Sequence, residues 1–174
     1  MGLIGDIMRP YTRRDRQRAD VTPLPFASAA ISLHTDKNLH LIFRSLACMA
    51  GREFFVIGSD DWFKGATNGL EEHIGITHFR NESEFLDYIR DTDYSLVAVE
   101  QSDRSVMINE VKEYPKNPLF MFGNESFGMG DDILLNSDLV IEIPNPGWHP
   151  CLNVGVSSGI IFYDFMTKHL QSAG

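Results

Sequence analysis

Cysteines, positive charges and long apolar runs are scarce in this sequence. Its two cysteines, Cys48 and Cys151, stand far apart and lack metal-ligand spacing, which argues against a disulfide framework and against a zinc site. No apolar run approaches the roughly 18 residues that a membrane-spanning helix needs. The N-terminus also lacks the apolar block of a secretory signal. We therefore expect a cytoplasmic protein with reduced thiols, no metal and no membrane segment.

Basic residues are outnumbered, since 15 Lys and Arg stand against 24 Asp and Glu for a net charge of −9. This balance argues against a general nucleic-acid binder, because contacts to phosphates need clustered cations. The distribution is uneven, however, and residues 1–20 have a local excess of positive charge. We predict that this segment is a basic, flexible tail. It is either a solvated terminus or a weak RNA-binding segment that uses Arg9, Arg13, Arg14, Arg16 and Arg18.

Residues 21–174 are predicted to form one domain. Hydrophobic residues make up 43% of the chain, which is enough for a substantial core. Strand-like and helix-like segments alternate, which indicates a doubly wound, mainly parallel α/β sheet. Predicted strands cover 29–33, 53–57, 94–99, 119–122 and 139–143. Predicted helices cover 38–50, a short piece within 58–75, a segment that Asn81 caps and that turns Phe85, Leu86 and Ile89 inward, 104–114 and 152–170.

The segment 117–163 is the most informative part of the chain. Its first apolar run ends in a turn of the form Gly-Asn-Glu-x-x-Gly (123–128), and its second ends in Ile-Pro and a Pro/Gly-rich loop (143–150). Cys-Leu-Asn (151–153) then opens the last helix. Ligands usually bind at the carboxyl ends of the strands in such sheets. We therefore expect the two loops to lie side by side at one sheet edge and to line a ligand site.

A third motif, Asn-Leu-His-Leu-Ile-Phe-Arg (38–44), opens the first full helix. Each motif has a structural explanation by itself. Asn38 can cap the helix, Arg44 suits a solvated face, and glycine-rich turns are common after strands. The three motifs in this order are much more specific than any one of them.

Together, over about residues 29–168, they resemble the SpoU (TrmH-like) family of SPOUT RNA 2′-O-ribose methyltransferases, in its minimal single-domain type. That family transfers a methyl group from S-adenosylmethionine to a ribose 2′-hydroxyl of RNA. The resemblance implies S-adenosyl-L-methionine as cofactor, RNA as substrate with tRNA favoured over rRNA, and a C-terminal trefoil knot in the α/β fold. It also implies a homodimer through the knot and the C-terminal helix. Packing within one chain is the alternative use of Gly155 and Gly159 on that helix.

The resemblance also implies roles for single residues. Arg44 would hold the phosphate beside the target ribose with its rigid, permanently charged fork and help to activate the hydroxyl. Asn38, Glu125 and Asn153 would orient the reacting groups and complete the catalytic set. The cofactor would lie against Leu119, Phe122, Gly123, Asn124, Gly128, Ile143, Pro144, Gly147, Cys151 and Leu152.

The sequence departs from the family pattern in two places. Cys151 stands where the family has Ser, and a thiol is a weaker hydrogen-bond donor than a hydroxyl. His40 and Leu41 stand where the family favours Gly and a small residue. One alternative is therefore a degenerate SPOUT fold that binds S-adenosylmethionine or a partner without methylating RNA. An unrelated doubly wound phosphate-binding protein is another.

Trp148 lies between the last two motifs. Packing within its loop is the expected use of this side chain, and stacking on a base or on adenine is the alternative.

Overall fold

A parallel sheet organises the residues that the computed structural model describes, which are 21–31, 36–58 and 69–172. Its seven strands follow the order β3-β2-β1-β6-β4-β7-β5, and every pairing is parallel. The predicted tail at 1–20 lies outside the described residues. The strands are β1 (Ala27–Ile31), β2 (Glu53–Ile57), β3 (Gly75–Phe79), β4 (Ser95–Val99), β5 (Val106–Met107), β6 (Pro118–Phe122) and β7 (Leu139–Glu142).

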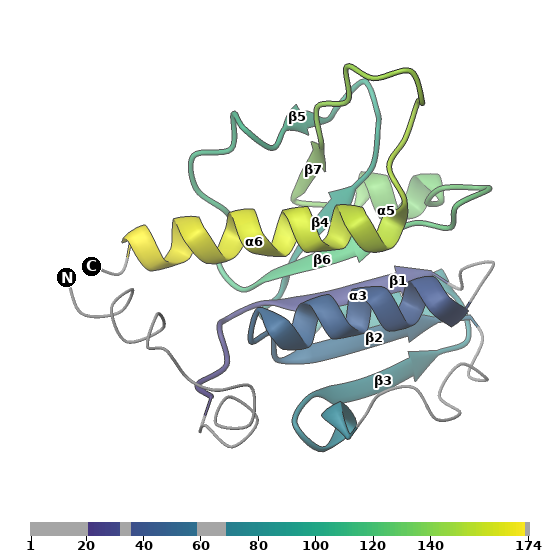
Figure 1. Ribbon diagram of the computed structural model, residues 1–174. Coiled ribbons are helices and arrows are strands. Elements are labelled where there is room, and N and C mark those ends of the chain that lie inside the picture. The colour runs from purple at the N-terminus through teal and green to yellow at the C-terminus, as the bar shows by residue number, and fades with distance from the viewer. Residues whose placement is uncertain (1–20, 32–35, 59–68, 173–174) are drawn as a thin grey trace.

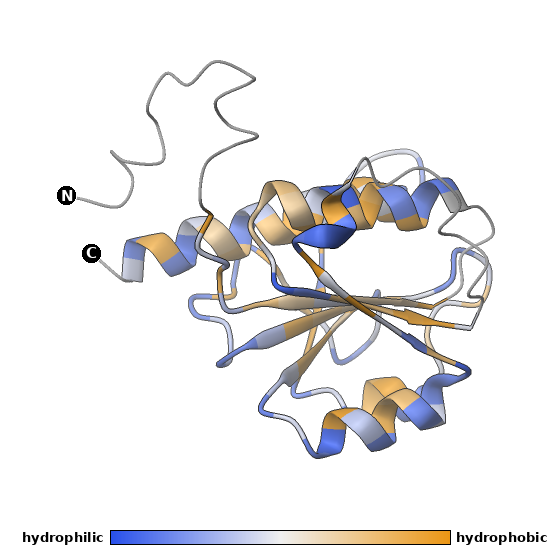
Figure 2. Cartoon of the chain, turned by 90° about the horizontal axis from the view of Figure 1, so that it is seen from below, coloured by the Kyte–Doolittle hydropathy of each residue, from blue (hydrophilic) through white to orange (hydrophobic). Residues whose placement is uncertain are grey.

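Helices cover both faces of the sheet. On one face lie α3 (Asp36–Cys48) and α6 (Val154–Ser172), and on the other α4 (Glu82–Arg90) and the short α5 (Asp131–Leu135) (Figures 1 and 2). The side chains of β6 alternate between the two layers. Phe120 packs with the α3 and α6 side, and Met121 packs with the α4 and α5 side. A strand buried on both faces needs apolar residues throughout, which explains the continuous apolar runs.

Aromatic rings fill the core beneath α6. The ring of Phe26, just before β1, lies 5.4 Å from that of Phe162 and 5.0 Å from that of Phe165. Phe120 of β6 contacts the same two rings at 5.9 and 5.7 Å. Because these rings are almost fully buried, they hold α6 firmly against the middle of the sheet. No helix among the described residues is long and apolar enough to cross a membrane.

Several predicted elements are confirmed. The strand 53–57 has the predicted bounds, and the strand predicted at 29–33 begins two residues earlier, at Ala27. Asn81 caps α4 as predicted, since its side-chain oxygen accepts a hydrogen bond from the backbone N–H of Glu84 at 2.9 Å. A 3-10 turn (Leu70–Glu72) corresponds to the short helical piece predicted within 58–75.

The helix predicted at 104–114 is wrong. This segment forms turns and the two-residue strand β5, which pairs with the edge of β7. Ile108, Val111 and Tyr114 are buried against the core at three-residue spacing, which imitates the periodicity of a helix. The open edge of β7 offers backbone partners, and the N–H of Ile108 takes one of them by donating to the carbonyl of Glu142 at 2.9 Å.

The sequence patterns missed two elements and assigned one helix cap wrongly. Strand β3 at the far edge and the five-residue α5 were not predicted. Helix α3 begins at Asp36, so Asn38 lies inside its first turn and does not cap it.

Helices α3 and α6 approach each other closely at a glycine. A Cβ atom added to Gly155 would lie 2.7 Å from the Cβ of Leu41, closer than real side chains allow. Gly159, one turn further along α6, has more room, because its nearest neighbour would be the hydroxyl of Ser45 at 3.9 Å. Packing within the chain, the alternative use considered for these glycines, therefore applies to Gly155.

The two glycines make a matched pair for measuring this contact. Alanine in place of a helical glycine gains about 1 kcal/mol of helix propensity. At Gly155 an overpacking cost of about 1–3 kcal/mol opposes that gain, because the contact is with a Cβ that cannot rotate away. We expect Gly155→Ala to lower the urea midpoint of unfolding and Gly159→Ala to raise it. Equal midpoint shifts for the two variants would contradict a tight contact at Gly155.

Candidate functional site

Three asparagine and glutamate side chains from distant parts of the sequence meet at the carboxyl edge of the sheet. The Nδ2 of Asn153, just before α6, donates to the Oδ1 of Asn38 on α3 at 3.1 Å. The Nδ2 of Asn38 in turn donates to the Oε1 of Glu125, in the turn after β6. The three residues that the resemblance assigned to orientation therefore form one directed relay.

The chemistry of the amide group explains why asparagine suits both positions. Asn153 caps α6, because its Oδ1 accepts from the backbone N–H groups of Gly155 at 3.0 Å and Val156 at 3.3 Å. Its NH₂ group remains available to reach Asn38. An aspartate could cap the helix but could not donate, so only an amide can do both.

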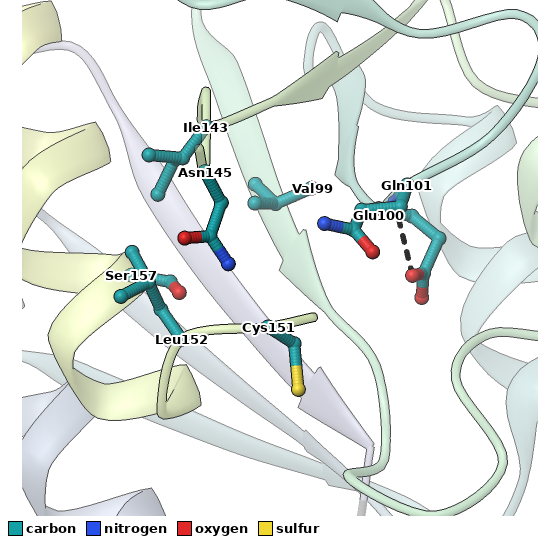
Figure 3. Close-up of a pocket in the computed structure, with 8 residues that line it drawn as sticks. All are labelled: Val99, Glu100, Gln101, Ile143, Asn145, Cys151, Leu152 and Ser157. Atoms are coloured by element: carbon teal, nitrogen blue, oxygen red, sulfur yellow. Dashed lines mark hydrogen bonds between the residues drawn. The ribbon is translucent and has the colours of Figure 1, made fainter. Parts of the chain in front are cut away.

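A hollow of about 110 Å³ lies at the same edge, beside the Cys-Leu-Asn segment. Val99, Ile143 and Leu152 provide its apolar lining. Gln101 and Asn145 turn their amide groups toward the space above Cys151 (Figure 3). The carboxylate of Glu100 points away from that space (Figure 3). The remaining lining residue is Ser157. Apolar walls with a few polar groups are typical of sites for flat, partly polar ligands.

The loop between β7 and α6 is held in place by side chains that bond to its backbone. The Nε2 of Gln101 donates to the carbonyl of Pro150 at 3.0 Å, and the Nδ2 of Asn145 donates to the carbonyl of His149 at 2.7 Å. The Nδ1 of His149 lies 2.8 Å from the carbonyl oxygen of Cys151. Gln101 thus ties the end of β4 to the loop that leads into α6.

The sheet order changes one expectation. Strand β4 lies between β6 and β7, so the two loops are at the same edge but are separated by the end of β4. The expectation that they lie side by side is therefore wrong. Instead, Glu100 and Gln101 occupy the space between them, where Glu100 lies next to the turn after β6. A Cβ added to Gly128 would be 3.0 Å from the Oε2 of Glu100.

The residues predicted to bind a cofactor fall into three groups. Ile143, Cys151 and Leu152 line the hollow. Leu119 and Phe122 are 0% and 1% exposed, so they belong to the core, and the structure corrects their assignment to the lining. The remaining predicted residues lie in the two loops without lining the hollow, namely Gly123, Asn124, Gly128, Pro144 and Gly147.

Sequence reasoning missed Val99, Glu100, Gln101, Asn145 and Ser157. A signal for three of them was present, since Val99 closes a predicted strand and Glu-Gln follows it at the ligand-binding edge of a parallel sheet. Asn145 and Ser157 carried no such signal, because only the loop geometry brings them to the hollow.

Arg44 lies on the exposed side of α3. It is six positions beyond Asn38, about one and two-thirds helical turns, so it projects from a different side of the helix. Leu41 lies three positions before it on a neighbouring surface and is 47% exposed. The structure therefore brings Asn38, Glu125 and Asn153 together and leaves Arg44 outside this relay, exposed on another side of α3.

A larger hollow of about 370 Å³ lies at the amino edge of the sheet, around Tyr114 and Phe165. The polar groups beneath it are paired with one another. The hydroxyl of Tyr114 donates to the Oδ2 of Asp164 at 2.7 Å, and the Nζ of Lys168 lies 2.7 Å from the same oxygen. Burial is the largest cause that raises the pKa of Tyr114, and the hydrogen bond to Asp164 is the second. We regard this network as structural, because no residue of the three motifs lines the hollow.

No group of His, Cys, Asp and Glu side chains that could hold a metal was found among the described residues.

Comparisons with known proteins agree with this geometry. Residues 29–163 match the model of the SpoU rRNA Methylase family. A tRNA (guanosine(18)-2'-O)-methyltransferase of Aquifex aeolicus is 33% identical over 101 residues, which cover 58% of this chain and 47% of the relative. The chain spans about half the length of this relative and a much smaller share of some others.

Solved structures share the fold. The methyltransferase AviRb from Streptomyces viridochromogenes, in complex with the cofactor AdoMet, aligns with a TM-score of 0.73 at 17% identity, over 90% of this chain and 64% of that one. A solved structure that is described as giving insights into the 2-OH methylation of C/U34 on tRNA aligns with a TM-score of 0.71 at 19% identity. The alignment covers 85% of this chain and 99% of that one.

Asn38→Asp tests the relay without changing side-chain size. The new carboxylate cannot donate to Glu125 and repels it, so we expect a loss of about 1 kcal/mol of folding free energy at neutral pH. Like charges raise carboxyl pKa values in the folded state, so stability should recover as the pH falls through those values. Urea unfolding at pH 7 and pH 4 measures this. Asn109→Asp, at an exposed turn, is the control. Identical behaviour of the two variants would contradict the relay.

Proposed function

This chain belongs to the SpoU rRNA methylase family, and we propose that it is an RNA ribose 2′-O-methyltransferase that uses S-adenosyl-L-methionine. The observation that carries the proposal is the relay from Asn153 through Asn38 to Glu125, with the hollow beside it. Three sequence motifs that lie far apart in the chain converge on one edge of the sheet. That edge is where open α/β sheets bind ligands.

The hollow suits one part of the cofactor. Val99, Ile143 and Leu152 offer the apolar surfaces that a purine ring needs, and the amides of Gln101 and Asn145 can pair with its polar edge. Ligand pockets typically measure roughly 300–1,000 Å³, so a hollow of about 110 Å³ fits one moiety such as the adenine. When bound, S-adenosylmethionine would supply an electrophilic methyl carbon for in-line transfer to a ribose 2′-oxygen, and it would leave as S-adenosylhomocysteine when the carbon–sulfur bond breaks.

The chain's own residues then position the RNA and stabilise charge. We assign Arg44 to the phosphate beside the target ribose, because a guanidinium stays protonated and pairs with phosphate through two parallel hydrogen bonds. Asn38, Glu125 and Asn153 are assigned to orientation, since the hydrogen bonds of their relay restrain the three side chains. Alignment of the reacting atoms is expected to supply most of the rate enhancement.

We propose tRNA as the RNA substrate. The curated relatives are tRNA methyltransferases, and the chain covers nearly all of the solved chain associated with C/U34 on tRNA. The five arginines of residues 1–20 remain proposed RNA contacts and lie outside the described residues.

We also propose a homodimer and a trefoil knot. Val156, Ile160 and Tyr163 form an exposed apolar stripe on α6, with exposed fractions of 52%, 37% and 57%. Leu41 on α3 continues this stripe, and a second copy that covers it would meet Arg44 at its border. For the knot, the support is the fold shared with the solved relatives and the insertion of β6 between β1 and β4.

Calorimetric titration with S-adenosylmethionine and S-adenosylhomocysteine tests the cofactor. We expect roughly micromolar binding at one site per chain for both ligands. Adenosine triphosphate, which shares the adenosine but lacks the sulfonium side chain, is the control and should bind more weakly. Preference for the triphosphate would favour a phosphate-binding protein. Absence of binding by either cofactor form, with and without bulk tRNA, would overturn the proposal.

Arg44→Ala tests the proposed catalytic role. We expect transfer of radiolabelled methyl to tRNA to fall by about 10²–10³-fold, because a charged contact to the reacting region is lost. Binding of S-adenosylhomocysteine should persist. Arg90→Ala is the matched control, since Arg90 lies on α4, on the opposite face of the sheet, and pairs with Asp87 at 3.0 Å. Unchanged methyl transfer in Arg44→Ala would remove Arg44 from the mechanism.

A further inference from the structure

Two aromatic side chains stand almost free of the protein on the loops beside the site. Phe127 is 86% exposed, and Trp148 is 108% exposed relative to a reference residue. The expectation that Trp148 packs within its loop is therefore wrong. Large aromatic rings usually gain stability by burial, so a ring left wholly in water contributes little to the fold.

Phe127 is presented by a tight, internally bonded turn. The backbones of Asn124 and Gly128 exchange two hydrogen bonds, at 2.9 and 2.8 Å. The side-chain Oδ1 of Asn124 accepts from the N–H groups of Ser126 at 2.8 Å and Phe127 at 3.3 Å. A Cβ added to Gly123 would lie 2.6 Å from the carbonyl carbon of Gly128, so the turn needs glycine there. The exposure of Phe127 thus belongs to a well-defined turn, which also carries Glu125.

Trp148 is presented by a loop that is held on both sides of it. Asn145 bonds across the tryptophan to the carbonyl of His149, and Gln101 bonds to the carbonyl of Pro150. Residues on either side of Trp148 face the hollow, since both Asn145 and Cys151 line it. The loop that carries Trp148 therefore borders the hollow on both sides of this residue.

The loops that carry Phe127 and Trp148 flank the end of β4. On one side, Gly128, next to Phe127, lies against the carboxylate of Glu100. On the other, Pro150, two residues after Trp148, accepts the hydrogen bond from Gln101. Glu100 and Gln101 are consecutive and line the hollow. The two loops that carry the rings thus lie on opposite sides of the end of β4, and both are at the ends of the strand arrows in Figure 1.

We propose that Phe127 and Trp148 are stacking platforms for unpaired bases of the RNA on either side of the target nucleotide. Aromatic rings recognise RNA mainly by stacking on bases that are not stacked in a helix. The substrate class that follows is a loop or other single-stranded segment of RNA. This inference rests on the proposed function and specifies the RNA structure that the same site accepts.

The charge of the protein favours this mode of binding. At a net charge of −9 the chain has little electrostatic attraction for RNA. Stacking does not depend on phosphate neutralisation, so it supplies affinity that salt does not screen. The alternative partner for these exposed rings is a second copy of the chain, which would cover them in place of RNA. The apolar stripe on α6 already offers that copy a helix face.

Tryptophan fluorescence provides the direct test. Trp62→Phe leaves Trp148 as the only tryptophan, because the chain has two. We expect the emission of a water-exposed indole in the free protein at all concentrations. A single-stranded RNA oligonucleotide should quench it saturably, and the same oligonucleotide in a duplex should not. RNA binding without quenching would overturn the proposal. So would a buried-type emission that shifts on dilution, since this would place Trp148 in a dimer interface.

Affinity measurements with variants that keep Trp62 make a second test that does not depend on the Trp62→Phe substitution. Trp148→Ala and Phe127→Ala should each weaken binding of single-stranded RNA by roughly tenfold, with an unchanged slope against salt. Trp148→Phe should restore most of the affinity. Leu135→Ala removes a 68% exposed apolar side chain elsewhere and is the control. Wild-type affinity in both alanine variants would overturn the proposal.

Cofactor titration of the same variants separates this inference from the proposed function. We expect S-adenosylhomocysteine to bind Trp148→Ala as it binds the wild type. A selective loss of cofactor affinity in that variant would place the indole on adenine and would overturn base stacking. If the wild-type protein binds no cofactor at all, the proposed function fails. Quenching of Trp148 by single-stranded RNA would still support base stacking, and RNA binding without quenching would still overturn it.

Discussion

The close approach of α3 and α6 is the contact on which the site depends. Gly155 lets the two helix backbones meet at Leu41, and this distance brings Asn153 within hydrogen-bonding reach of Asn38. Burial of aromatic rings beneath α6 fixes the helix on the sheet, so the polar contact is formed between rigid partners. The hydrophobic core therefore sets the geometry of a relay that is itself polar and partly exposed.

The loops of the site are ordered by side-chain amides. Asn124 folds the turn after β6, Gln101 and Asn145 hold the loop after β7, and Asn153 caps α6. An amide group has both donors and an acceptor, so it can satisfy backbone groups that no strand or helix pairs. Loops built in this way keep a defined shape without being buried. That property suits a site that must remain open to a large substrate.

The acidity of the chain and its proposed RNA substrate are compatible, because a few local contacts are enough to bind one nucleotide. Several described arginines are engaged elsewhere, as in the pairs of Arg80 with Glu84 and of Arg90 with Asp87. Arg44 remains on the exposed side of α3, the helix that also carries Asn38. A single well-placed guanidinium, together with exposed rings, can bind one nucleotide without a broad basic surface. Such a surface would bind RNA less selectively, because phosphate contacts carry no sequence information.

The sequence by itself determined the buried strands and the α4 cap at Asn81, because continuous apolar runs and short-range capping motifs act locally. The residues of the relay were named through the family resemblance, and their contacts follow from the fold. The tertiary structure decided the rest. The segment 104–114 formed turns and the two-residue strand β5 because the edge of β7 was open to it, although its apolar spacing was helical. Gln101 and Asn145 reached the hollow because β4 lies between β6 and β7. Strand order and loop path depend on contacts between residues far apart in the chain, and no local pattern encodes them.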